Sequence, residues 1–336
     1  MKKIAILAFL IMGFTSVKAQ DYHFAQYYLN PMSVNPALSG QFNGCVRMNA
    51  LYRNQWATVL GKSAFSTYAA SLDMQLLKDQ LKGNFIGAGV NFFNDVGGDL
   101  KYGTTAMGFN IAYCQILAKK KPMTISGGLQ LGNWQKKMDL SNIKLENQLG
   151  VGAVTNSVNF MDFGAGVVFY HQPISWLSYQ SGMSLTHLNS ANQSFAHFND
   201  AIGKRFQFHT TVFIQAADAF TVIPMIHYSA QQKARELNVG SLVKVLIDDN
   251  GKWETAVFFG MSTRFTNPGA DAATAYFRFN VANLSIGLAY DFNISQLHVI
   301  SNHLGGPELG LQYMIRCPQS KATVYNKRKK LFCPKF

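Results

Sequence analysis

The residue types best suited to catalysis or ligand binding in this sequence are a Gly-Lys-Ser step and the histidines. Gly61-Lys62-Ser63 resembles the end of a phosphate-binding loop, but the glycine required five residues earlier is Trp56. The sequence contains no Gly-x-Ser-x-Gly elbow and no His-Glu-x-x-His pair. The histidines lack the spacing of metal ligands; they include His171, His187, His197, His209 and His227. We therefore expect no cofactor, no metal and no enzyme, although a Ser-His-acid cluster assembled across strands stays open as a third reading.

The four cysteines fall into two pairs. Cys45 and Cys114 lie in candidate strands, where we expect buried thiols. Cys317 and Cys333 each precede a proline, and a disulfide between them is expected in an oxidising compartment. The segment 317–336 carries six positive charges and no acid, so it is either a disordered basic tail or a periplasmic docking element.

The first nineteen residues have the pattern of a secretory signal. Lys2 and Lys3 precede the apolar run 4–12, and small residues end at Ala19, where cleavage is predicted. No cysteine follows that site to take a lipid, and no later run of 18 uncharged apolar residues suggests a membrane helix. The sequence therefore predicts an exported chain.

Composition indicates the class of exported protein. Charged residues make up only 14%, aromatic residues 13%, and there are 28 glycines, whereas soluble domains carry about 25% charged residues. The net charge is +13, or about +10 once Lys2, Lys3 and Lys18 leave with the signal. For an exported chain we expect no nucleic-acid partner, so outer-membrane lipid headgroups or an acidic protein partner are the expected partners of this charge.

Alternating side chains indicate strands that separate an apolar face from a polar one. In the segment 104–117, Met107, Phe109, Ile111 and Tyr113 alternate with small and polar residues. The same pattern predicts fourteen strands, at 44–56, 64–75, 83–93, 102–117, 122–134, 160–171, 177–187, 203–216, 219–229, 236–247, 252–264, 273–282, 283–293 and 305–316. Such strands suit a transmembrane antiparallel outer-membrane β-barrel. The alternative, an open sandwich, would need polar outward faces.

The connections supply an orientation. Even-numbered connections are short, as at 118–121 and 172–176, whereas odd-numbered ones include 135–159 and 188–202. Outer-membrane barrels have short periplasmic turns and longer extracellular loops. We therefore predict a signal peptide (1–19), a lead-in that is either periplasmic or inserted into the lumen (20–43), a barrel (44–316) and a basic periplasmic tail (317–336).

The lead-in contains the stretch "NPMSVNPALSG", whose two Asn-Pro steps and final Ser-Gly predict a stiff, kinked path. With its neighbours it resembles the PorP/SprF family of type IX secretion outer-membrane proteins. The matching residues are Gln20, Asp21, Phe24, Gln26, Tyr27, Asn30, Pro31, Asn35, Pro36, Ala37, Gly40, Arg53, Gln55 and Trp56. Further similarity runs through "GAGVNFFND" (87–95), "FGAGVVFY" (163–170) and "PELGLQY" (307–313).

The resemblance implies a non-enzymatic barrel. Its partners would be other type IX secretion components and a secreted cargo protein, often a large adhesin, recognised through a C-terminal sorting domain and attached to the cell surface. In some gliding bacteria the cargo includes moving adhesins. The alternative from the barrel alone is a diffusion channel or an uptake barrel for hydrophobic ligands.

Two arginines of the first strand complete the candidate site. Arg47, Asn49 and Arg53 share one face of that strand, and this face should point inward because a charge facing the bilayer centre costs about 2–4 kcal/mol. Inward arginines could fill the lumen, bind the lead-in or bind a cargo carboxylate. The candidate barrel-mouth or partner-binding residues are therefore Asn30, Pro31, Asn35, Pro36, Gly40, Arg47, Arg53, Gln55 and Trp56.

Overall fold

The computed structural model describes residues 21–139, 156–196, 198–249, 254–267, 269–296 and 298–316. The predicted signal peptide, Gln20, His197 and the tail 317–336 with Cys317 and Cys333 lie outside these residues. Within the described chain no helix is long and apolar enough to cross a membrane.

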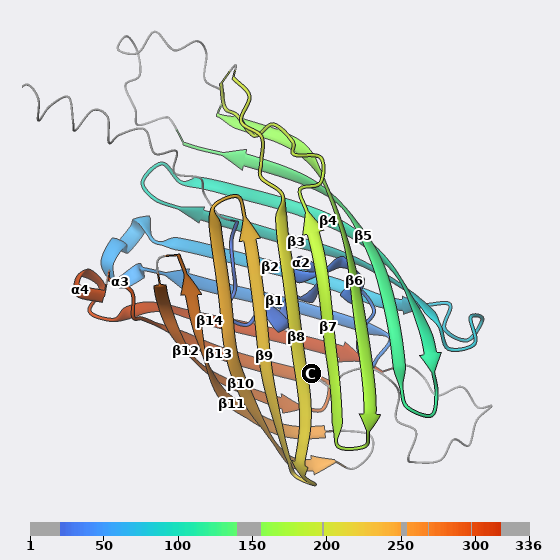
Figure 1. Cartoon of the computed structure of the whole chain (residues 1–336). Coiled ribbons are helices and arrows are strands. Elements are labelled where there is room, and N and C mark those ends of the chain that lie inside the picture. The colour runs from blue at the N-terminus through green and yellow to red at the C-terminus, as the bar shows by residue number, and fades with distance from the viewer. Residues whose placement is uncertain are drawn as a thin grey trace, which may run out of the picture.

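Fourteen antiparallel strands form one closed barrel in which each strand pairs with its sequence neighbours and β1 pairs with β14 (Figure 1). The strands are β1 (Val46–Gln55), β2 (Phe65–Leu76), β3 (Phe85–Gly97), β4 (Tyr102–Ala118), β5 (Met123–Lys137), β6 (Ser157–Ile174), β7 (Leu177–Thr186), β8 (Arg205–Ala217), β9 (Phe220–Gln231), β10 (Ala234–Asp249), β11 (Glu254–Thr266), β12 (Gly269–Val281), β13 (Leu284–Asn293) and β14 (Leu304–Ile315). The predicted fold and all fourteen strands are confirmed.

Alternation along each strand separates the lumen from the outer surface. On β4 the side chains of Phe109 and Ile111 are exposed, whereas Asn110 and Ala112 are buried. Exposed apolar residues recur on every wall, among them Leu129, Met261 and Leu288. A closed barrel that satisfies its backbone hydrogen bonds and turns apolar side chains outward is suited to lipid.

The longest connections all lie at one end of the barrel. They join β5 to β6 (138–156), β7 to β8 (187–204) and β13 to β14 (294–303), and the last includes the helix α4 (His298–Ser301). The β1–β2 connection at this end holds α3 (Ala57–Leu60) and η3 (Gly61–Ser63), beside α4 in Figure 1. We call this end the outer mouth and the end with the short turns the inner, periplasmic mouth.

The main departure from the predicted boundaries is at strand ends. β3 runs to Gly97, β6 begins at Ser157 and β12 begins at Gly269, each several residues beyond the prediction at the outer mouth. These extensions are paired in the ladder, for example Gly97 with Tyr102. Backbone pairing continues past the apolar belt there, so side-chain alternation alone could not reveal it.

Candidate functional site

The lead-in, residues 21–45, lies inside the barrel and runs from the outer mouth to the start of β1 at the inner mouth. It forms three short turns, η1 (Tyr27–Leu29), α2 (Pro31–Val34) and η2 (Pro36–Leu38). Asn30 and Asn35 precede the prolines with φ of −128° and −156°, and each proline opens a helical turn. Proline restricts the residue before it and suits a first helical position, so the two Asn-Pro steps set the kinked path.

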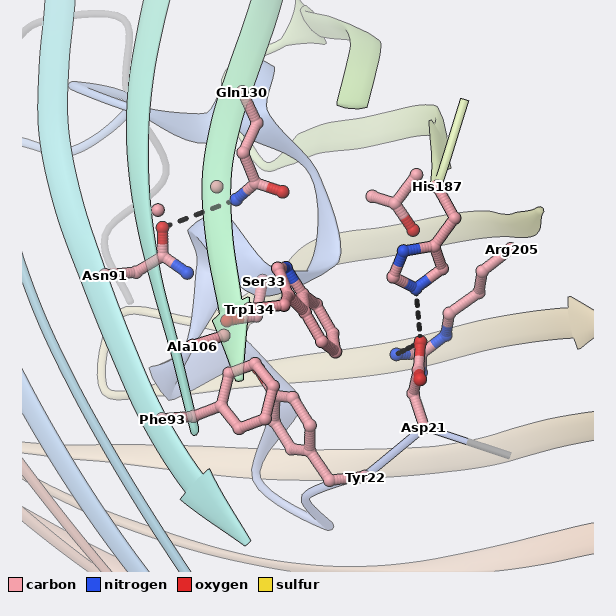
Figure 2. Close-up of a pocket in the computed structure, with 13 residues that line it drawn as sticks. Asp21, Tyr22, Ser33, Asn91, Phe93, Ala106, Gln130, Trp134, His187 and Arg205 are labelled. Carbon is pink, nitrogen blue, oxygen red and sulfur yellow. Dashed lines mark hydrogen bonds and ion pairs between the residues drawn. The ribbon is translucent and has the colours of Figure 1, made fainter. Parts of the chain in front are cut away.

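The outer end of the lead-in is held by an imidazole between two carboxylates, of which Figure 2 shows His187 with Asp21. His187 Nε2 lies 2.7 Å from Asp21 Oδ2, and His187 Nδ1 lies 2.8 Å from Asp162 Oδ1 of β6. Arg205 Nη1 is 3.8 Å from the same Asp21 oxygen. The Asp21 backbone N–H donates to Gln231 Oε1 at 3.0 Å. The first described residue is thus bound by β8, β9 and the β7–β8 loop.

This arrangement changes the protonation of His187, which follows the last residue of β7. Burial lowers its pKa, but the carboxylates of Asp21 and Asp162 outweigh that effect and raise the pKa to about 9. His187 is therefore an imidazolium at neutral pH and donates a hydrogen bond to each carboxylate.

A second anchor at the outer mouth binds the backbone of the lead-in. Glu308 of β14 accepts the N–H groups of Ala25 at 2.8 Å and Gln26 at 2.7 Å. Arg53 Nη1 lies 3.3 Å from Glu308, and Arg53 Nη2 lies 2.6 Å from Asp291. Arg264 of β11 also pairs with Asp291, at 2.9 Å. Asp291 thus lies between two guanidinium groups, and Glu308 contacts one guanidinium group and two N–H groups, which offsets part of the cost of burying these acids.

The middle of the lead-in is bound chiefly through Asn35. Its side-chain amide donates to the carbonyls of Val167 on β6 and Met183 on β7, each at 3.0 Å, and its Oδ1 accepts the N–H of Ala37. Ser184 Oγ donates to Val34 O at 2.6 Å, and Ser126 Oγ donates to Ala37 O at 2.9 Å. Strand side chains therefore pair with lead-in carbonyls that no helix or sheet satisfies.

The inner end is bound by Arg47 and Asp73. Arg47 donates to Asp73 through Nε at 3.0 Å and Nη2 at 2.8 Å, and Nη2 also reaches Leu38 O at 3.2 Å. Asp73 Oδ2 accepts the Gly40 N–H at 2.8 Å, where the backbone has φ of +73°. This bidentate pair is completely buried and joins β1, β2 and the lead-in.

Glycines of the inner faces make room for the lead-in. A Cβ on Gly166 would collide with Asn35 Oδ1, and one on Gly128 would collide with the backbone of Ala37. Gly127, by contrast, has nothing within 4 Å of such a Cβ. The glycine content that suggested a barrel therefore also reflects the close approach of a second backbone.

Apolar packing completes the filling of the lumen. Phe24, Tyr27, Tyr28 and Leu29 of the lead-in are buried in one cluster with strand residues, including Leu51, Ile223, Met225 and Phe258. Tyr27 stacks on His227 with ring centroids 4.7 Å apart. The lumen thus holds a packed core flanked by polar anchors.

The predicted site residues separate into two places. Asn30, Pro31, Asn35, Pro36, Gly40, Arg47 and Arg53 are all buried in the lumen. Gln55 and Trp56 lie at the outer mouth and are partly exposed; Arg53 Nη2 is 3.5 Å from Gln55 Oε1. Trp56 has φ of 66° and donates its N–H to Gly305 O at 3.0 Å, immediately before α3.

The cysteines correct the sequence analysis. Cys114 is a buried free thiol, as expected, but Cys45 is disulfide-bonded. The predicted Cys317–Cys333 disulfide lies outside the described residues. The error arose because Cys45 precedes the first residue of β1 and so belongs to the rim, where the end of β14 lies opposite.

Sequence reasoning missed the acids that bind the lead-in. Asp73, Asp162, Asp291 and Glu308 are all at most 2% exposed and occupy inward positions of strands. Their signal was present, because an acid inside a transmembrane strand requires a cation or backbone donors. Their partners come from distant strands, which spacing in the sequence does not reveal.

This chemistry favours holding a segment over transforming a substrate. Both ring nitrogens of His187 are engaged by carboxylates, so neither is available to activate a nucleophile. Among the described residues no group of His, Cys, Asp and Glu has metal-binding geometry. The cavity in Figure 2 is bounded by the lead-in itself, through Asp21, Tyr22 and Ser33.

Comparisons with known proteins follow this geometry. No curated protein matches the sequence. Similar solved structures include CdiB from Acinetobacter baumannii (6% identity, 80% of this chain and 60% of that chain covered, TM-score 0.44), the Ralstonia pickettii toluene transporter TbuX (10%, 85% and 93%, 0.46) and the CymD monoaromatic hydrocarbon channel (12%, 91% and 97%, 0.46). The chain thus spans less than two thirds of CdiB. The family model described as type IX secretion system membrane protein PorP/SprF matches residues 16–308, most of the sequence, and the chain belongs to this family.

Proposed function

We propose that this barrel serves type IX secretion as a plugged partner protein that retains a secreted cargo at the outer membrane. The observation that carries the proposal is the lead-in, which fills the lumen and is anchored near both mouths and in the middle. A diffusion channel or hydrophobic-ligand uptake barrel needs a continuous path, which this segment obstructs. In this proposal the cargo is a large adhesin recognised through its C-terminal sorting domain, with surface attachment or gliding as the output.

The extracellular rim is the surface available to such a cargo. Arg47, Arg53 and the candidate residues Asn30, Pro31, Asn35, Pro36 and Gly40 are buried, so we assign them to shaping the barrel and not to contacting a partner. Trp56, in contrast, is partly exposed and immediately precedes α3, whose four residues are all exposed, including Val59 and Leu60. A tryptophan held in the left-handed region stores strain, which is frequent at functional sites. We therefore place cargo contact at Trp56 and α3.

The test combines co-purification with conductance. A tag is placed after Phe336, outer membranes are solubilised in detergent, and the proteins that co-purify are identified by mass spectrometry. We expect a large secreted protein whose C-terminal domain alone suffices for recovery, and no steady conductance of the purified barrel in planar bilayers. A barrel recovered alone that conducts solutes would replace this proposal with the channel.

Matched variants locate the contact. Val59→Ser with Leu60→Ser should reduce cargo recovery at least tenfold, because exposed apolar side chains supply much of the energy of an interface. Leu77→Ser changes a leucine at the inner mouth that is at least as exposed as Leu60, and should leave recovery unchanged. Equal loss in both variants would refute the outer-rim assignment.

A further inference from the structure

Five lysines cluster on one sector of the inner mouth. Lys78 and Lys82 lie in the β2–β3 connection, and Lys119, Lys120 and Lys121 lie in the β4–β5 turn. The two connections are neighbours because β3 pairs with β4, and Ile116 N donates to Asn84 Oδ1 between them at 2.8 Å. They lie near each other at the right of Figure 1. We call this group the basic sector.

Four of the five lysines of the basic sector extend into solvent. Lys82, Lys119, Lys120 and Lys121 are exposed, and within the described ranges none of them forms an ion pair. Asp79 is the one acid in these two connections. Lys78 is positioned by Gln75 Oε1 at 3.0 Å and by the ring of Phe85. The sector therefore presents a concentrated positive surface to the periplasm.

The opposite wall of the same mouth has the other sign. The β8–β9 turn carries Asp218 and the inner end of β10 carries Asp248 and Asp249, whereas Glu254 at the start of β11 is paired with Lys244. These strands lie across the barrel from β2–β5 in the strand order. Among the described residues, the inner mouth is thus basic along β2–β5 and acidic along β8–β10.

This asymmetry distinguishes between two anionic partners. Lipid headgroups surround a barrel on all sides, so lysines that serve only as lipid anchors are expected around the whole rim. A folded protein approaches from one direction, and complementary charge sets both its orientation and its encounter rate. We infer that the basic sector docks a periplasmic protein that presents clustered carboxylates. This docking is separate from cargo retention at the outer mouth and does not rest on it.

Zero-length carbodiimide coupling tests the inference in intact outer membranes that contain the full chain. The reagent joins a lysine amine to a carboxylate only when the two are in contact. We expect peptides containing Lys119–Lys121 or Lys82 to be coupled to Asp or Glu side chains of one periplasmic protein. Raising sodium chloride from about 0.01 M to about 1 M shortens the Debye length from about 30 Å to about 3 Å, and should reduce coupling at least tenfold.

Three variants complete the test. Lys119→Gln, Lys120→Gln and Lys121→Gln together should abolish coupling at this turn and the co-purification of the partner at low salt. The corresponding arginine triple cannot be coupled by the reagent but should keep the partner, because its charge remains. Lys62→Gln, Lys101→Gln and Lys137→Gln remove three exposed lysines at the outer mouth and should change neither result.

Two outcomes would overturn the inference. One is the absence of protein coupling combined with anionic phospholipid that stays bound in native mass spectrometry and is lost in the glutamine triple. The other is equal coupling of the outer-mouth lysines, which would show that the reagent reports general exposure. Cargo recovery is measured on the same samples, so failure here is distinguishable from failure of the cargo proposal.

Discussion

Arg53 on β1 and Asp291 on β13 form an ion pair of 2.6 Å across an intervening strand. β14 pairs with both strands, and its Glu308 also contacts Arg53 while binding the backbone of Ala25 and Gln26. The pair therefore ties the seam where the barrel closes to the segment that fills it. A change that releases the lead-in should therefore also weaken the pairing of β1 with β14.

Replacing Glu308 should weaken both the closure of the barrel and the attachment of the lead-in. In Glu308→Ala, two lead-in N–H groups and one contact of Arg53 lose their acceptor, and removing one partner of a buried pair costs about 3–5 kcal/mol. We expect a lower unfolding midpoint, measured by the heat-dependent gel shift of the barrel, and faster proteolysis of residues 21–30. Asp218→Ala, at an exposed turn, is the control. An unchanged midpoint in Glu308→Ala would contradict the coupling.

The glycine contacts make a sharper prediction about the lumen. Gly166→Ala places a methyl group against Asn35, and such overpacking typically costs about 1–3 kcal/mol. Gly127→Ala, in the neighbouring strand, places it in open space. We expect a cysteine introduced at Ser33 to react faster with a thiol reagent in the first variant only, in a background that carries both Cys114→Ser and Cys333→Ser. Equal rates would show that the lead-in does not need this glycine.

The anchor at Asp21 should respond to alkaline pH. Because the pKa of His187 is raised to about 9 from 6.5, its contribution to stability is complete below about pH 6.5 and is lost as the pH rises through about 9. Attaching a fluorophore through a cysteine at position 21 would remove the Asp21 carboxylate. The fluorophore is therefore attached at the next position, through Tyr22→Cys. Its mobility should increase between pH 8 and about 10, as measured by anisotropy. In the His187→Gln variant the fluorophore should be mobile at all pH values, without this transition.

The rim disulfide has a predicted connectivity. Cys45 N–H donates to Ile315 O at 2.7 Å, and Val46 pairs with Ile315, so residue 316 lies opposite Cys45 and Cys317 follows directly. We predict a Cys45–Cys317 bond, with Cys333 left as a thiol. Peptide mapping without reduction should recover the 45–317 linkage. A 45–333 linkage would show that the tail folds back across the inner mouth.

The extent of sequence prediction follows from how each feature is encoded. Alternation is local, so Phe109 or Leu288 could be assigned to the outer surface and β4 or β13 recognised from a few residues. The two Asn-Pro steps are local as well, and the kinked path they predicted is present. Asp73 and Glu308 were missed because their partners, Gly40 and Ala25, are brought to them only by closure of the sheet.

The same distinction explains the cysteine error. Cys45 precedes a strand by one residue, and its position in the sequence resembles that of a strand thiol. Only the pairing of the first strand with the last brings it beside the end of β14. Contacts between the two ends of a chain carry no local signal.

The direction of the lead-in has a consequence for biogenesis. Its first described residue lies at the outer mouth, whereas its far end continues into β1 at the inner mouth. The turn opened by Pro36 fits tightly against the backbone of Gly128, so this segment could not slide lengthwise through a finished barrel. We expect instead that the sheet closes around this segment, so that β1 pairs with β14 only after Asp21 has crossed the plane of the membrane.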